Sequence, residues 1–415
     1  MRSPPLTMAA AMATATIALG SAHADPLGPF VEHRLFSPGP QQFGLFGYSV
    51  AVKGPVMIVG AFGEDGVEPS TGAAYVYRRV AGAWVQEARL IAPDGHTDDL
   101  FATSVTLDGD TVVLGSPRAV TPDGIPCGAA YVFRRVAGQW GLEAELFPSD
   151  RTPFGDFGYD LGVALSGDTL VVGADGPEDD GLPGLAAYVF TRRGTAWTQT
   201  AVLTNPDSAT PAGFGDTVSI DGKTIVVGAS LEADGAGAAY VFRLQHDRWV
   251  KQARLAASDP TPGAAFGFST AIDGETIAVG ATSGLNDAGL DSGAAYVFER
   301  RDGGWAQTAR LAPADGKTGN SFGYRVAVAD ELVAVGALKT TSPAGVTTGA
   351  VYLYQPAHHA WSQQAELFPS DGARIGRFGC SLATDGRTLL VGNGVQRIQG
   401  VAFVGEAYTY DLGDD

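Results

Sequence analysis

The sequence predicts an all-β protein, a seven-bladed β-propeller of four-stranded antiparallel blades whose last blade is closed by an N-terminal strand. Three observations lead to this fold. The 415 residues include 57 glycines and show no long amphipathic helical pattern, which is typical of many short strands joined by turns. A Phe-led motif recurs seven times at intervals of 52 to 57 residues. The last copy lacks its final segment, and a matching segment precedes the first copy.

Each copy carries four marks in a fixed order. An aromatic residue followed by a small one opens the copy, at Phe46, Phe101, Phe157, Phe214, Phe266, Phe322 and Phe378. A Val-Gly-Ala motif or close variant follows, with its glycine at Gly60, Gly115, Gly173, Gly228, Gly280, Gly336 and Gly392. The third mark is GAAYVF or a variant, starting at Gly72, Gly128, Leu185, Gly237, Gly293, Gly349 and Gly405. The fourth is a segment led by Trp84, Trp140, Trp197, Trp249, Trp305 and Trp361.

These marks predict strands A, B, C and D of one blade. The A–B connection is often an Asp-Gly pair, which favours a tight hairpin turn because glycine accepts positive φ. The fourth segment alternates apolar and polar residues with a period of two, as a half-buried strand does. Four strands joined by hairpins form a meander, and a propeller blade is such a meander.

The predicted blades cover about 44–91, 100–147, 156–204, 213–256, 265–312, 321–368 and 377–411, within a propeller of residues 25–415. The seventh copy ends without a Trp-led strand, and residues 30–36 resemble that strand, so we expect them to close the ring. The third copy is irregular. Counting back from its A–B turn reaches Tyr159 instead of Phe157, which predicts a bulge or a late start of its strand A.

The N-terminus predicts export. Residues 1–24 contain Arg2, an apolar run and an Ala-x-Ala site ending at Ala24, as a signal peptide does, and the run is too short to span a bilayer. We expect a secreted or periplasmic monomer. The net charge of −18 disfavours nucleic acid and anionic membranes as partners. Cys127 and Cys380 lie at non-equivalent places, and the sequence leaves open whether they form a disulfide.

The paired Phe-Gly and Gly-Ala marks, followed by a Tyr-Val strand, resemble the FG-GAP repeats of the integrin α-subunit propeller and of simpler bacterial proteins. The resemblance covers about residues 30–411 and implies an adhesion or ligand-binding role outside the cell. Integrin-type repeats carry calcium loops between strands A and B, whereas this chain has tight turns there. We therefore interpret the aspartates of these turns as turn formers and expect no cofactor: Asp108, Asp221, Asp273 and Asp385.

Long, variable B–C and D–A loops share one face of a propeller, and ligand contacts are expected there. The B–C loops are acidic, and their carboxylates are the candidate ligand-binding residues: Glu64, Asp65, Glu68, Asp175, Glu178, Asp179, Asp180, Glu232, Asp234, Asp287 and Asp291. The group of Asp175, Asp179 and Asp180 is the weak candidate for a divalent cation, although no ligand spacing recurs and solvated loops explain it as well.

Other repeated residues are interpreted as structural. The D–A loops carry an aspartate in six copies, for which we expect a turn or a backbone cap: Asp94, Asp150, Asp207, Asp259, Asp315 and Asp371. A serine recurs in strand A without a fixed histidine partner, so it is not a nucleophile: Ser49, Ser104, Ser269 and Ser381. The Trp series is expected to pack the outer strands.

No catalytic motif is present, so no residue is predicted to be catalytic. The main hypothesis is an exported binding or adhesion module that presents its long loops to an extracellular protein or glycan. One alternative is a glycan-active enzyme with a carboxylate site at the propeller hub, and another is a structural propeller of a cell-surface assembly.

Overall fold

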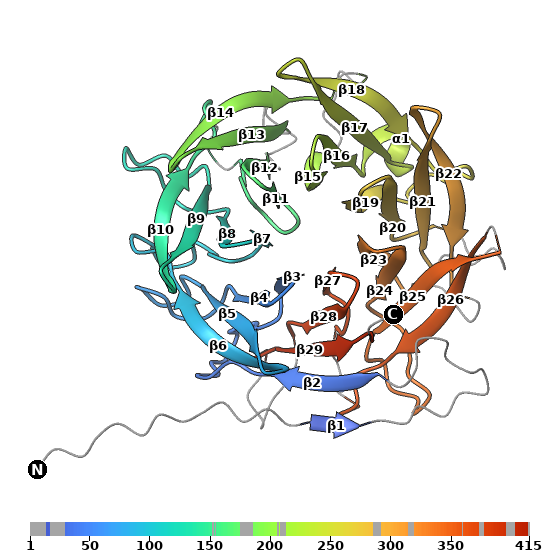
Figure 1. Cartoon of the computed structure of the whole chain (residues 1–415), viewed down its shortest axis with the longest axis horizontal. Coiled ribbons are helices and arrows are strands. Elements are labelled where there is room, and N and C mark those ends of the chain that lie inside the picture. The colour runs from blue at the N-terminus through green and yellow to red at the C-terminus, as the bar shows by residue number, and fades with distance from the viewer. Residues whose placement is uncertain are drawn as a thin grey trace, which may run out of the picture.

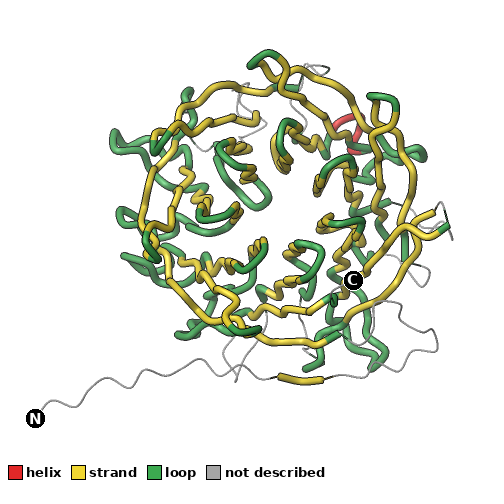
Figure 2. Tube along the Cα trace, in the orientation of Figure 1, coloured by secondary structure: helices red, strands yellow, loops and turns green. Residues whose placement is uncertain are grey.

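The chain is described by a computed structural model that covers residues 30–151, 153, 155–174, 186–205, 207, 213–284, 292–313, 319–358, 360–372, 377–395 and 403–413, and the backbone of 14–16. Within these residues the strands form seven antiparallel sheets arranged as blades around a central hub (Figure 1). The innermost strands surround the hub and the outermost strands form a nearly continuous outer ring (Figure 2). The predicted seven-bladed all-β propeller is confirmed.

The strands follow the predicted A–B–C–D order in each blade. The first two blades are β3 (Ser49–Lys53), β4 (Val56–Ala61), β5 (Ala73–Val80) and β6 (Ala83–Leu90), then β7 (Val105–Asp108), β8 (Thr111–Ser116), β9 (Ala129–Val136) and β10 (Gln139–Leu146). The next two are β11 (Val163–Ser166), β12 (Thr169–Ala174), β13 (Ala186–Arg193) and β14 (Ala196–Leu203), then β15 (Phe214–Asp221), β16 (Thr224–Ala229), β17 (Ala238–Gln245) and β18 (Arg248–Leu255), with the short α1 (Glu232–Gly235) in the B–C loop.

The last three blades complete the ring. They are β19 (Phe266–Asp273), β20 (Thr276–Ala281), β21 (Ala294–Arg301) and β22 (Gly304–Leu311), then β23 (Phe322–Ala329), β24 (Leu332–Ala337), β25 (Ala350–Ala357) and β26 (Ala360–Leu367), and finally β27 (Ser381–Thr384), β28 (Thr388–Asn393) and β29 (Glu406–Asp411) with β2 (Val31–Leu35).

The N-terminal strand closes the seventh blade as predicted. Strand β2 pairs antiparallel with β29, and Leu35 lies opposite Ala407 just as Leu90 lies opposite Ala74 in the first blade. Strand β2 precedes the first blade in the chain and β29 belongs to the last, so their pairing closes the ring. The backbone of β1 (Thr14–Thr16) pairs with the outer edge of β2. Strand β1 lies within the segment that is expected to be the signal peptide.

The hydrophobic core lies between adjacent blades. The opening Phe of each copy is buried and packs against the Tyr of strand C in the same blade, as Phe266 does against Tyr296 at 5.3 Å between ring centroids. At the rim, the indole N–H of Trp197 donates to Glu143 of the preceding blade at 3.0 Å. The indole thus joins two blades, which confirms the structural interpretation of the Trp series.

The Phe-Gly and Gly-Ala marks meet across each blade interface. A Cβ on Gly280 would lie 2.0 Å from the carbonyl oxygen of Gly323 in the next blade, so only glycine permits this approach. The Ser269 hydroxyl donates to the same carbonyl at 2.9 Å. The other repeated serines make the equivalent bond, namely Ser49, Ser104 and Ser381. The repeated serine is therefore a structural link between blades.

The A–B turns are also linked around the opposite face. The Asp221 carboxylate accepts from the amide of Gly274 in the next turn at 3.0 Å, and Asp385 accepts from Gly54 at 2.8 Å across the ring closure. Asp108 accepts from Gly167 in the same way. These carboxylates thus bind the neighbouring turn, and Asp385 also accepts from the amide of Thr388 in its own turn at 2.8 Å.

Two further features complete the fold. Cys127 and Cys380 are both buried and free, so they do not form a disulfide in this structure. No helix within the described ranges is long and apolar enough to cross a membrane.

Candidate functional site

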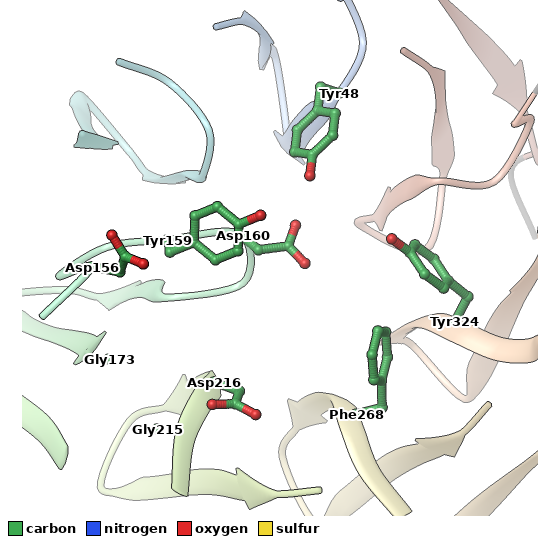
Figure 3. A pocket seen from close by; sticks show the side chains of 9 residues that line it. All are labelled: Tyr48, Asp156, Tyr159, Asp160, Gly173, Gly215, Asp216, Phe268 and Tyr324. Atoms are coloured by element: carbon green, nitrogen blue, oxygen red, sulfur yellow. The ribbon is translucent and has the colours of Figure 1, made fainter. Parts of the chain in front are cut away.

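A cavity of about 250 Å³ lies at the hub, where the residues following the opening Phe of several copies meet. Because strand A begins next to the D–A connection, this end of the hub belongs to the long-loop face. The cavity is lined by Tyr48, Asp156, Tyr159, Asp160, Gly173, Gly215, Asp216, Phe268 and Tyr324 (Figure 3). Aromatic rings and carboxylates from five blades therefore share one concave site.

The irregular third blade builds one wall of the cavity. Its strand β11 begins only at Val163, which confirms the predicted late start of strand A. The extra residues form a tight turn, closed by the Gly162 amide donating to the Tyr159 carbonyl at 2.7 Å. This turn carries Asp160, whose carboxylate points toward Tyr48 and Tyr324 in Figure 3. The irregularity in the repeat is thus the element that brings a carboxylate into the hub.

Asp160 forms an ion pair across the hub with Arg325 of the sixth blade. The guanidinium Nη2 lies 2.5 and 2.8 Å from the two carboxylate oxygens, and it joins residues that are 165 positions apart in the chain. The Arg325 side chain is only 3% exposed, and its guanidinium lies 4.4 Å from the ring centroid of Tyr324. Burial opposes the charge on Arg325, but Asp160 and the neighbouring Tyr324 hold its pKa above the ordinary value.

One of these two residues replaces the structural serine of the repeat. Arg325 lies opposite Gly336 as Ser269 lies opposite Gly280. In the third blade Gly162 takes that place, because the Gly173 amide donates to its carbonyl. Asp160 comes two residues earlier, in the inserted turn, and binds Arg325 across the hub. A substitution at the serine position and an insertion in another blade are therefore complementary in charge.

The rest of the cavity combines hydroxyl donors with acceptors. Burial, together with the nearby Asp160, raises the pKa of Tyr48, and burial raises the pKa of Tyr324, so both phenols keep their protons at neutral pH. Asp216 accepts from the Ser230 hydroxyl at 3.2 Å. Phe268 and Tyr324 pack together at 5.2 Å between centroids. A polar ligand with an apolar face suits this combination of groups.

The predicted acidic residues of the first B–C loop lie elsewhere on the long-loop side. Glu64 is 1% exposed and accepts from the Tyr75 hydroxyl at 2.5 Å, and burial raises its pKa. The Asp65 carboxylate accepts a hydrogen bond from the Gln41 side-chain amide at 3.2 Å, and Glu68 accepts from the Thr97 backbone amide at 2.9 Å. Glu64 thus binds strand β5 of its own blade, and the other two carboxylates bind neighbouring loops. None of the three is among the residues that line the hub cavity.

In the fourth blade, Glu232 accepts from the Tyr240 hydroxyl at 2.6 Å and from Arg254 at 2.8 Å. Burial opposes ionisation of Glu232, but these bonds lower its pKa overall. Asp234 follows in α1 with a positive φ of 59°. The remaining candidates lie outside the described residues, namely Asp175, Glu178, Asp179, Asp180, Asp287 and Asp291. Among the described residues, no group of three His, Cys, Asp or Glu side chains could hold a metal ion.

The repeated aspartate of the D–A loops has a structural role, but a different one from the expected turn or cap. In four copies its carboxylate accepts from the buried Tyr hydroxyl of the next blade, as Asp150 does from Tyr188 at 2.6 Å and Asp259 from Tyr296 at 2.8 Å. Asp207 pairs with Lys251 instead, and Asp315 lies outside the described residues. A buried hydroxyl needs such a partner, and sequence spacing alone does not reveal one that comes from another blade. The Asp259 carboxylate also pairs with an arginine of strand D, Arg310, at 2.9 Å.

The second blade changes this arrangement, because Glu145 stands where the fifth blade has Arg310. The Tyr131 hydroxyl donates to Asp94 at 3.1 Å, and burial together with the Asp94 charge raises the pKa of Glu145 to about 7. Two carboxyl groups thus share one site between the first and second blades.

The hub residues are not among the predicted site residues, all of which belong to the acidic B–C loops. Their signal in the sequence is a departure from the repeat. Arg325 interrupts the serine series, and Asp160 belongs to the insertion in the third copy. Asp216 stands where the first and sixth copies carry Tyr48 and Tyr324.

Comparison with protein families gives one result. The model of the FG-GAP repeat matches residues 32–77, 84–133, 140–190, 197–242, 249–298, 305–354 and 361–410. Each match begins on the outer strand of one blade and ends on strand C of the next, and the first begins on the closing strand β2. No curated protein matches the chain.

Proposed function

The chain belongs to the FG-GAP repeat family, and we propose that it is an exported binding or adhesion module that holds an extracellular protein or glycan at its long-loop face, with the hub cavity as the ligand site. A propeller of this family is a binding or structural module, and the fold by itself specifies no ligand. The proposal is carried by one observation: the departures from the seven-fold repeat converge on a single cavity.

In a repeat protein, the residues that only build the blades recur in most copies. Ser269 and its equivalents occur in four of the seven copies, and each makes the same bond to the next blade. A buried ion pair such as Asp160–Arg325 is no more stabilising than well-packed neutral residues. Because its carboxylate, Asp160, lines an aromatic cavity, the pair favours selection for binding over selection for stability.

Binding of the full-length chain to glycan and protein arrays tests this proposal. We expect saturable binding that is lost in a Tyr48→Ala/Tyr324→Ala variant, because two walls of the cavity are removed. Asp221→Asn is the matched control, since this residue lies in an A–B turn on the opposite face. Binding that survives in the hub variant, or an absence of binding on both arrays, contradicts the proposal.

One observation also favours an enzyme acting on glycans, namely the three carboxylates that line the cavity, Asp156, Asp160 and Asp216. Glycoside hydrolysis uses two carboxyl groups on either side of the bond that is cleaved. Release of reducing ends from a polysaccharide panel, abolished in Asp216→Asn, would establish this alternative. Binding without any release supports the binding module.

A further inference from the structure

The aromatic wall of the hub cavity is suited to the flat face of a small ring. Tyr48, Tyr159, Phe268 and Tyr324 come from four different blades and surround the axis (Figure 3). The face of an aromatic ring carries partial negative charge and attracts the weakly positive C–H groups of an apolar ligand face. Sugar rings present such C–H faces beside their hydroxyl groups.

The polar groups of the cavity complement hydroxyl groups. An ionised carboxylate only accepts hydrogen bonds, and bonds to it are stronger than those between neutral groups. Asp156, Asp160 and Asp216 provide such acceptors in the cavity. The protonated phenols of Tyr48 and Tyr324 provide donors. A ligand with several adjacent hydroxyls, each both donor and acceptor, matches this set.

The charge of the ligand follows from Arg325. Its guanidinium already occupies the place that a cationic ligand would take, bound to Asp160 and stacked on Tyr324. A cationic ligand would therefore find Asp160 already paired, with Asp156 and Asp216 as the remaining carboxylates of the cavity. An anionic ligand would be repelled by Asp156 and Asp216. A neutral ligand with several hydroxyl donors can bind to all three carboxylates, because each oxygen accepts more than one hydrogen bond.

The size of the cavity limits the ligand to about one ring. Its volume of about 250 Å³ lies below the range of roughly 300–1,000 Å³ that holds a drug-sized ligand. We propose that the hub cavity binds one neutral pyranose ring, stacked on the aromatic wall with its hydroxyls bonded to the three hub carboxylates. This proposal rests on the proposed binding function and specifies its ligand.

Saturation-transfer NMR and calorimetry with free monosaccharides test the proposal directly. The probes are glucose, galactose, mannose, fucose and N-acetylglucosamine, with glucuronate, choline and arginine methyl ester as charged comparisons. We expect at least one neutral sugar to bind at millimolar concentrations, and Asp216→Asn and Phe268→Leu each to weaken that binding about tenfold or more. Phe43→Leu is the matched control, because Phe43 is an exposed aromatic residue that does not line the cavity.

Three outcomes overturn the proposal: a charged probe binds in place of every neutral sugar, no monosaccharide binds, or a sugar binds equally well to the two hub variants. Thermal melts of the variants establish that each one is folded. If no sugar binds but the chain binds an arrayed protein through the hub, the proposed function stands and the sugar proposal alone fails.

Discussion

The ion pair between Asp160 and Arg325 offers the sharpest test of how the hub is built. Arg325 stands where four other copies carry a serine, and Asp160 lies in the inserted turn of the third blade. Serine is therefore the repeat's own residue at the first position and a small neutral replacement at the second. The two partners differ in burial, since the Arg325 side chain is 3% exposed and that of Asp160 is 23% exposed. Removing either one therefore leaves a charge in a different environment.

The expected costs follow from that difference. Asp160→Ser leaves a guanidinium buried without its carboxylate, which costs roughly 3–5 kcal/mol. Arg325→Ser leaves a carboxylate that water partly reaches and supplies a hydroxyl beside the Gly379 carbonyl, so we expect a cost of about 1–2 kcal/mol. The double variant removes both charges, and its cost should be smaller than that of Asp160→Ser alone.

Urea unfolding followed by tryptophan fluorescence measures these differences as shifts of the midpoint at constant slope. A loss of 3–5 kcal/mol lowers the folding equilibrium constant by about 10² to 10⁴. Equal costs for the two single variants would refute the burial argument. Additive costs in the double variant would show that the pair does not act as a unit.

Three further predictions concern the blade interfaces and the turns. The stability of Glu145→Gln relative to wild type should rise between about pH 5 and pH 8 in parallel urea titrations. The folded-state pKa of Glu145 is about 7 against an ordinary 4.5, so its contribution to the stability of the wild type is fully present below pH 4.5 and is lost as the pH rises through 7. A constant difference between the two proteins would contradict the carboxyl pair with Asp94. Gly280→Ala should lower the free energy of unfolding by about 1–3 kcal/mol or more in the same assay, because its Cβ would meet the Gly323 carbonyl. Gly304→Ala is the control and should be nearly neutral, since the nearest atom to its Cβ lies at 3.9 Å. Similar effects at both sites would rule out the close-approach explanation. Thermal melts with calcium and with chelator should coincide, because the A–B turns are too short for an integrin-type loop, and a shift of several degrees would refute this.

The fold could be predicted because its determinants recur along the chain. The Phe-Gly and Gly-Ala marks occur in every blade or nearly so, since each interface needs a glycine under the next blade's carbonyl. The closing strand was predictable from the same repetition, because Leu35 aligns with Leu90. Even the late strand A of the third blade was visible as a break in the spacing.

Roles that depend on contacts between blades were not predictable in this way. The D–A aspartates, such as Asp150, were expected to serve their own turn, but they accept from a tyrosine of the next blade. The sequence spacing within one copy indicates the bonds that a residue makes to its neighbours in the chain, whereas Tyr188 belongs to another blade. Glu64 was expected to face a ligand and is instead buried against Tyr75 of its own blade, because the B–C loop folds back onto strand C.

The sequence by itself determined the repeat, the number of blades and the closure, because these follow from periodic patterns of apolar residues, glycines and turns. Only the tertiary structure decided where the candidate site lies. The ring brings Asp160 within 2.5 Å of Arg325 although 165 positions separate them, and it does so because strand A of every blade starts at the hub. A circular arrangement places equivalent positions of distant repeats side by side, so single departures from the repeat become neighbours in one cavity.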